Sequence, residues 1–267
     1  MYKKAFISVS VLAWLLWFGG CSLINSGDLE EPVSSSSLAE NVDSSGSNSQ
    51  VLQSSSLTFS SSSVSTELVS CESYDASAHF CDTRDGTIYK YVQIGDQVWM
   101  AENLRYLPSL NGIDTSSTEP KYYVYGYNGT DVSAAKATEN YQTYGALYNW
   151  PAALKACPVG WHLPTDAEWT ALEDYVGGSS TAGEKLKATS GWRDNGNGTD
   201  EYGFWALPGG YFYSGLFFSV SSGGYWWSAS EYDASYAYLR GMVYSYDYMP
   251  SGYYSKGYGF SVRCVKD

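Results

Sequence analysis

The sequence changes character abruptly at Cys71, and this change limits what the chain can fold into. Nineteen of the 49 residues from 22 to 70 are serine, whereas 25 of the 26 tyrosines fall in residues 71–267. A serine-rich segment cannot bury enough apolar surface to offset the backbone entropy lost on folding. We therefore predict one folded domain, residues 71–267, preceded by a disordered linker, residues 21–70.

Residues 1–20 have the charge order of an export signal: two lysines precede an apolar run too short for a comfortable membrane span. The run ends in Phe18-Gly19-Gly20-Cys21, which resembles a lipobox. We expect residues 1–20 to be a lipoprotein signal peptide and Cys21 to carry acyl chains such as palmitate. The domain would then be anchored to the cell envelope, at the outer membrane, facing the periplasm or the cell exterior. Because Phe18 is bulkier than the usual aliphatic residue, an ordinary signal peptide or an uncleaved anchor stays open.

The charge of the predicted domain limits its partners. The chain has a formal net charge of −13; without the two lysines of residues 1–20 and the six acidic residues of 21–70, residues 71–267 keep −9. Such an acidic surface repels phosphate backbones, so we expect no nucleic-acid partner. Divalent cations, neutral glycans and other proteins remain open as ligands.

Local patterns predict a strand hairpin first and helices in the middle. Thr87–Ile94 and Gln97–Leu104 are strand-like runs separated by Gly-Asp, a signal for a tight hairpin. A helix is expected over Tyr144–Ala156. Thr165 with Glu168 and Thr181 with Glu184 have the spacing of capping boxes that open two further helices.

From Tyr202 onward, short runs rich in aromatic residues alternate with glycine and proline, which is typical of strands and tight turns. The whole pattern predicts the α+β class: a mostly antiparallel twisted sheet with two or three short helices and long loops.

Four cysteines remain for the domain if Cys21 carries lipid, and an even number in an exported domain favours two disulfides. Four cysteines allow three pairings. Cys71 and Cys81 are close in sequence near the start of the domain, while Cys157 follows a predicted helix and Cys264 lies in the last predicted strand. We predict one local and one long-range bridge, Cys71–Cys81 and Cys157–Cys264.

Several motifs along the domain resemble one family, the Fibrobacter succinogenes major paralogous domain. The motifs cover nearly all of residues 80–267 in order: DGTIY at 85–89, QVWMAENL at 97–104, CPVGWHLP at 157–164, ALPGG at 206–210, YWWSA at 225–229 and YGFSVRC at 258–264. That family is similar to formylglycine-generating enzymes and C-type-lectin-like proteins, in which a Leu-Pro-Thr turn precedes a capped helix and a Gly-Phe strand closes the sheet. The resemblance therefore implies a C-type-lectin-like fold. It implies little about activity, since one fold hosts many functions.

The residues that catalysis would need are sparse. The reactive cysteine pair of formylglycine-generating enzymes has no counterpart between Trp161 and Arg263. His79 and His162 are the two histidines of the chain, and a buried or capping role is the simpler interpretation of each. We expect no enzymatic activity and no catalytic residue, although a hydrolase based on two carboxylates stays open.

An acidic, glycine-rich run between residues 194 and 201 offers oxygen ligands for a hard cation. The candidate calcium ligands are Asp194, Asn195, Asn197, Asp200 and Glu201. The spacing is not that of an EF-hand, and an ordinary Asx-rich turn without metal is the alternative. No other cofactor is expected.

Aromatic residues are more frequent than a core of this size needs, at 17% of the chain. Exposed rings give large contact areas at small entropy cost, so we expect a binding or adhesion module with Trp226, Trp227, Tyr246, Tyr248 and Tyr254 as candidate ligand contacts. Because Trp226 and Trp227 are adjacent on a strand, one is expected to face the core and the other solvent. The ligand would be a polysaccharide or, alternatively, an envelope protein, and the rings could instead simply be core residues.

Overall fold

The protein is described by a computed structural model in which residue 71 and residues 73–267 are placed. These residues fall within one compact unit, Ser63–Asp267. The predicted signal peptide, the lipidation site Cys21 and the linker, residues 21–70, lie outside the described residues. In the described part of the chain, no helix is long and apolar enough to cross a membrane.

The first large sheet has the strand order β1-β2-β3-β12-β6, and its pairs are antiparallel. Its strands are β1 His79–Asp82, β2 Thr87–Ile94, β3 Gln97–Met100, β6 Trp161–His162 and β12 Val265–Lys266. The predicted hairpin is confirmed, because Ile94 pairs with Gln97 across a tight turn in which Gly95 has φ +61°. β3 ends at Met100 and not at the predicted Leu104, so the residues that follow are free to form loop structure.

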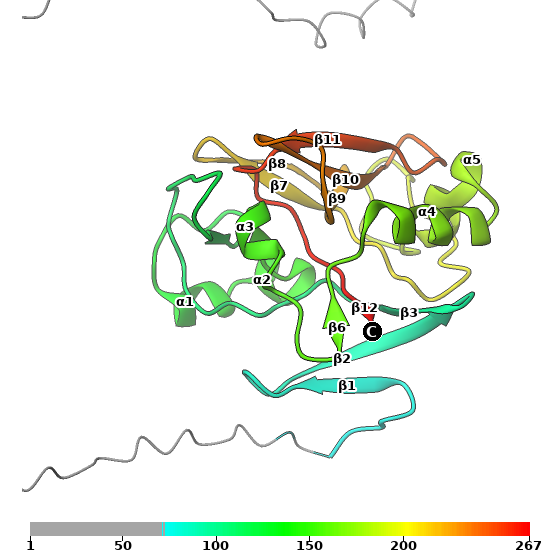
Figure 1. Ribbon diagram of the computed structural model, residues 1–267, viewed down its shortest axis with the longest axis horizontal. Helices are drawn as coiled ribbons and strands as arrows, with labels where there is room; N and C mark the ends of the chain where they lie inside the picture. Colours follow the sequence, from blue (N-terminus) through cyan, green and yellow to red (C-terminus); the bar gives the residue numbers. More distant parts are fainter. Residues whose placement is uncertain (1–70, 72) are drawn as a thin grey trace, which may run out of the picture. The chain divides into compact units, whose positions relative to one another are not determined.

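The second large sheet has the order β11-β10-β9-β7-β8. Its strands are β7 Gly209–Tyr213, β8 Leu216–Val220, β9 Gly223–Glu231, β10 Tyr236–Val243 and β11 Ser251–Ser255, and a small sheet pairs β4 Tyr122–Tyr123 with β5 Leu147–Tyr148. All pairs are antiparallel except β7 with β9, which are parallel where Gly210 meets Gly224. Figure 1 shows the two large sheets on opposite sides of the domain, with the helices at its flanks. The architecture is mostly β with curled antiparallel sheets and short helices, which is compatible with the predicted α+β class.

Five helices occur among the described residues, rather than the two or three predicted. They are α1 Val132–Lys136, α2 Glu139–Tyr144, α3 Trp150–Ala153, α4 Asp166–Tyr175 and α5 Ser179–Leu186. The capping box of Thr165 and Glu168 is confirmed at the start of α4. The second capping box is wrong: α5 begins at Ser179, and its N-cap Gly178 makes no side-chain cap.

The predicted helix over Tyr144–Ala156 is also wrong. Gly145, with φ +78°, ends α2, and the chain then forms β5 before Asn149 caps α3 with its side chain. A left-handed glycine is a common helix stop, and Pro151 in the first turn is compatible with a new helix start.

Strand β9 runs between the two main clusters of the hydrophobic core. Trp227 packs in the cluster that contains Phe260, and Trp226 packs in the cluster that contains Trp99 and Trp169. Both indoles are fully buried. The two side chains do point to opposite faces, but the prediction that one of them faces solvent is wrong because both faces of β9 are covered by core.

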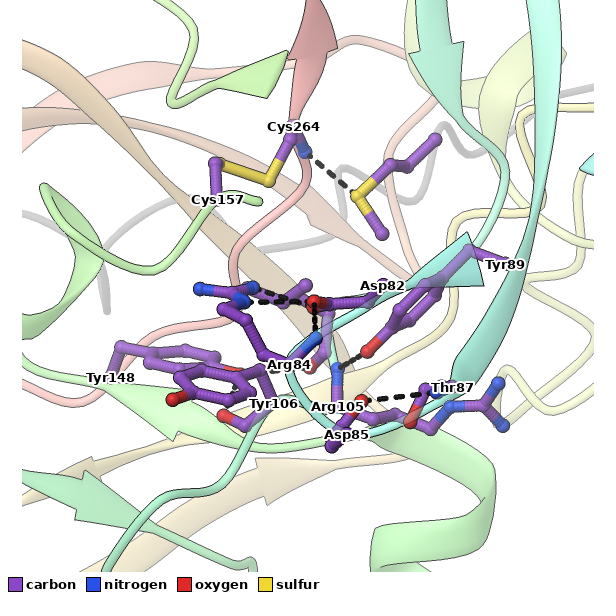
Figure 2. Close-up of polar contacts among 12 residues, drawn as sticks. Asp82, Arg84, Asp85, Thr87, Tyr89, Arg105, Tyr106, Tyr148, Cys157 and Cys264 are labelled. Atoms are coloured by element: carbon purple, nitrogen blue, oxygen red, sulfur yellow. Dashed lines mark hydrogen bonds and ion pairs between the residues drawn. A yellow bond between two sulfur atoms is a disulfide. The ribbon is translucent and has the colours of Figure 1, made fainter. Parts of the chain in front are cut away.

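Two cysteine pairs lie at disulfide distance, and they are the two pairs that the sequence predicts. Cys157 and Cys264 have a Cα–Cα distance of 5.9 Å and join the loop after α3 to the residue before β12 (Figure 2). Cys71 and Cys81 have a Cα–Cα distance of 6.1 Å and tie the start of the described chain to β1.

Candidate functional site

The aromatic residues predicted to contact a ligand do not form one site. Trp226 donates its indole N–H to Asn103 Oδ1 and Trp227 donates to Tyr148 O, both at 2.8 Å, so each is a hydrogen-bonded core residue. A ligand could reach neither ring without opening the core.

The three predicted tyrosines lie in different surroundings. Tyr246 and Tyr248 follow β10, and their ring centroids are 4.8 Å apart. Tyr254 lies on β11 and contacts Tyr258 and Phe260 instead. Tyr248 and Tyr254 are each 41% exposed, so both remain accessible, but nothing joins them into a shared pocket.

A denser group of exposed rings covers the β10–β11 edge of the second sheet. We call it the tyrosine cluster; it consists of Tyr232, Tyr236, Tyr238 and Tyr253. The rings of Tyr232 and Tyr253 are parallel, with centroids 3.8 Å apart, and both are nearly half exposed. β11 is an edge strand of its sheet, so the cluster borders a row of backbone groups that no further strand of the described residues covers.

The predicted calcium loop is held together by its own hydrogen bonds and ion pairs. Asp194 pairs with Arg193, Glu201 lies 3.9 Å from the Lys185 ammonium, and Asn197 Oδ1 accepts from the Trp192 N–H at 3.0 Å. Within residues 71 and 73–267, no group of three or more His, Cys, Asp or Glu side chains is placed to hold a metal ion. Among the described residues, the carboxylates of Asp194, Asp200 and Glu201 are thus not gathered into a metal-binding group, and the calcium and turn interpretations of the run that also contains Asn195 and Asn197 both stay predictions.

His162 connects strand β6, on which it lies, to helix α4 and to Asp267. Its ring nitrogens lie 2.7 Å from Glu168 Oε1 and 2.7 Å from Asp267 Oδ1. Partial burial lowers its pKa, but the hydrogen bonds to these two carboxylates outweigh burial and raise the pKa overall. Glu168 is the N3 residue of the capping box of α4, so the contact of His162 supports the start of this helix.

A pocket of about 360 Å³ lies beside Trp205, and we call it the Trp205 pocket. Four segments surround it: β2, the residues after β3, the end of α2 and the loop around residues 200–207. Its lining combines charged, amide and aromatic side chains: Lys90, Glu102, Asn103, Arg105, Gln142, Asp200 and Trp205. This volume is within the range of about 300–1,000 Å³ that small-molecule sites usually have.

The backbone of Trp205 is held in an unusual conformation. Its φ is +55°, a left-handed value that is an outlier for a bulky side chain. Asp200 Oδ1 accepts the Trp205 N–H at 2.7 Å, and the Trp205 carbonyl accepts from Arg263 Nη2 at 3.3 Å. The neighbours Phe204 and Ala206 are fully buried, whereas the Trp205 indole is 41% exposed at the pocket. Strain of this kind concentrates at ligand sites, which motivates a functional role for this indole.

Arg263 lies beneath the pocket and is fully buried. Its guanidinium donates to the Phe204 carbonyl and to Asn103 Oδ1, and it lies over the Phe204 ring. Burial lowers its pKa to about 9, which leaves it charged at neutral pH. The negative charges that act on it come from Glu102 and Asp200, which both line the pocket.

Hydrogen bonds and an ion pair fix the part of the pocket lining that contains Lys90, Glu102 and Arg105. Glu102 Oε1 accepts the Lys90 N–H at 3.1 Å, and Glu102 Oε2 lies 3.1 Å from Arg105 Nη2. Figure 2 shows the Arg105 backbone N–H donating to the Tyr89 hydroxyl, at 2.8 Å. Burial raises the pKa of Tyr89, so this hydroxyl stays neutral. This part of the lining is therefore preorganised, with Arg105 and Glu102 neutralising each other.

A second pocket of about 510 Å³ lies between residues 115–118, Tyr213 and Ser255. Its polar groups are hydroxyls and backbone groups, and it has no acidic or basic side chain in its lining. It lacks the combination of a strained aromatic residue and fixed charges that distinguishes the Trp205 pocket.

Residues 92–266 match the profile of the Fibrobacter succinogenes major domain. The chain belongs to this family. No curated protein and no solved structure matches the chain. The matched residues 92–266 include every lining residue of the Trp205 pocket except Lys90.

Sequence reasoning missed Trp205, although it included Asp200 for another reason. The available signal was two adjacent aromatic residues, Phe204 and Trp205, directly after a glycine in an otherwise polar loop. Such a pair indicates that one ring faces the core and the other does not, but it says nothing of the left-handed backbone.

Proposed function

We propose that the chain is an exported, lipid-anchored protein that presents a non-catalytic saccharide-binding module, with the Trp205 pocket as its binding site. The observation that carries this proposal is an exposed indole held rigidly over a polar pocket. The flat face of an indole packs against the C–H groups of a sugar ring, and nearby amide and charged groups hydrogen-bond its hydroxyls. A pocket with one aromatic face and a few fixed polar groups suits such a ligand.

We further propose that the fold is C-type-lectin-like. Two features support it: the Leu163-Pro164-Thr165 turn leads into the capped helix α4, and Gly259 and Phe260 form bridges to Phe212 and Tyr148 that close the core. Both features correspond to the motifs on which the family resemblance rests.

The proposed lipid anchor depends on Cys21, which the domain structure does not include. Cys21→Ala is expected to abolish acylation and to move the protein from the membrane fraction to the soluble or precursor fraction. Protease treatment of intact cells then separates a domain facing the cell exterior from one facing the periplasm.

The second candidate function is attachment to an envelope protein, and the tyrosine cluster favours it. Exposed tyrosine rings at an edge strand give a protein partner both contact area and backbone hydrogen-bonding groups. Tyr232→Ala together with Tyr253→Ala should then weaken capture of a defined envelope protein and leave saccharide binding unchanged.

A glycan array tests the saccharide proposal directly. Wild type and Tyr175→Ala, which removes an exposed ring that does not line the pocket, should bind the same saccharides, and Trp205→Ala should lose them. If wild type binds no saccharide, or if Trp205→Ala binds as wild type does, the proposal fails. If wild type releases products from a bound saccharide and Glu102→Gln does not, the function is carboxylate-based hydrolysis and not binding alone.

A further inference from the structure

We propose that the Trp205 pocket selects acidic saccharides, with the carboxylate of a uronic acid bound by Lys90 while the sugar ring packs on Trp205. This inference rests on the proposed function and adds the class of ligand. It is argued from the charges that surround the pocket.

Lys90 is a cation in the pocket lining, and its charge acts on Asp200 at long range. Its side chain is exposed on β2 and lines the pocket, and it forms no ion pair with any described residue. The other cation of this lining, Arg105, is already engaged by Glu102 at 3.1 Å. An anionic group of a ligand would therefore find its partner in Lys90 without displacing an existing ion pair.

Arg263, which contacts the lining residues Asn103 and Trp205 but does not itself line the pocket, adds further positive charge. The Arg263 guanidinium is fully buried, donates to carbonyl and amide oxygens rather than to a carboxylate, and has an Nε with no hydrogen-bond partner in the described residues. A buried cation without a close counter-charge is costly, and a bound anion nearby reduces that cost.

Asp200, the second carboxylate of the pocket, opposes an anionic ligand only weakly. One of its oxygens already accepts the Trp205 N–H, and the positive charges of Arg263 and Lys90 act on it. Burial raises its pKa overall, which makes its charge easier to neutralise when a second anion approaches.

The contrast with the rest of the domain supports selection rather than general attraction. Residues 71–267 carry a formal net charge of −9, so the surface as a whole repels acidic polymers. An acidic saccharide that binds must therefore be held by a local site. The Trp205 pocket is such a site, because the positive charges of Lys90 and Arg263 outnumber the one carboxylate there that is not in an ion pair, Asp200.

The test compares one sugar with and without its charge. Tetragalacturonate and its fully methyl-esterified form have the same rings, and the ester lacks the carboxylate charge. Titration of the full domain, followed by calorimetry, should show at least tenfold tighter binding of the acid, as expected for one charge-assisted hydrogen bond. Lys90→Gln should reduce this preference to less than threefold. Lys155→Gln, at an exposed lysine that does not line the pocket, should behave as wild type.

The outcomes separate this inference from the proposed function. Equal affinity for acid and ester, preference for the ester, or a preference that persists in Lys90→Gln overturns the inference. If neutral saccharides bind and Trp205→Ala abolishes that binding, the proposed function stands without it. A sulfated oligosaccharide that binds where tetragalacturonate does not overturns the assignment to a carboxylate. If no saccharide binding depends on Trp205, the inference and the proposed function fail together.

Discussion

The protein should be more stable with glycine than with alanine at position 205, although alanine is usually the more stabilising of the two residues. Trp205 has φ +55°, and a left-handed backbone costs an L-residue about 1–2 kcal/mol that glycine does not incur. Glycine loses about 0.5–1 kcal/mol more than alanine in chain entropy on folding. Because Trp205→Ala and Trp205→Gly lose the same indole contacts, those contacts cancel in the comparison. The glycine variant is therefore expected to be more stable by up to about 1.5 kcal/mol.

Urea unfolding with the disulfides intact measures this difference as a shift in midpoint at constant slope. The control is Ala167→Gly, on an exposed position of α4, where glycine should cost about 1 kcal/mol. If glycine in place of alanine stabilises the protein at position 205 and destabilises it at position 167, the backbone of residue 205 is strained in the wild type. Greater stability of Trp205→Ala would show that residue 205 is not left-handed, and backbone strain would then no longer support a functional role for the indole.

Three further predictions concern the core, the histidine and the disulfides. Trp226→Ala and Trp227→Ala should each destabilise by about 3–5 kcal/mol in chemical unfolding, because both indoles are fully buried; tolerance of either would contradict that burial. The raised pKa of His162 predicts a stability contribution that is complete below about pH 6.5 and is lost as pH rises through the raised pKa. Because the ring is partly exposed this contribution should be at most about 1 kcal/mol, and unfolding of His162→Gln should lack it across the same pH series. Cys157→Ser should lower the free energy of unfolding more than Cys71→Ser does, by about 2 kcal/mol in the chain-entropy model for separations of 107 and 10 residues; an equal loss would indicate that loop closure does not dominate.

Features set by neighbouring residues could be predicted from the sequence. The hairpin around Gly95 and the capping box of Thr165 and Glu168 each depend on a few consecutive residues, and the structure contains both. The predicted helix across Gly145 failed because the prediction did not treat this glycine as a helix stop, whereas in the structure it ends α2.

Features set by distant residues could not be predicted. The alternation of Trp226 and Trp227 is a local property, but the burial of both depends on the two core clusters that cover β9. The conformation of Trp205 likewise depends on a hydrogen bond from Arg263, 58 residues further along the chain. Asp200, which accepts the Trp205 N–H, lies five residues away in the sequence, but Arg263 does not, and the candidate site was missed because local patterns do not contain both supports.

The place of β12 in its sheet imposes an order on biosynthesis. Val265–Lys266 lie between β3 and β6, so the strands that emerge first from the ribosome have no complete sheet to join until residues near 265 have been made. The Cys157–Cys264 bridge has the same requirement. The first sheet can thus be completed only late in synthesis, and the nascent chain contains no complete domain before then. If the chain is exported unfolded, as we propose, this delay would keep the domain from closing before its passage.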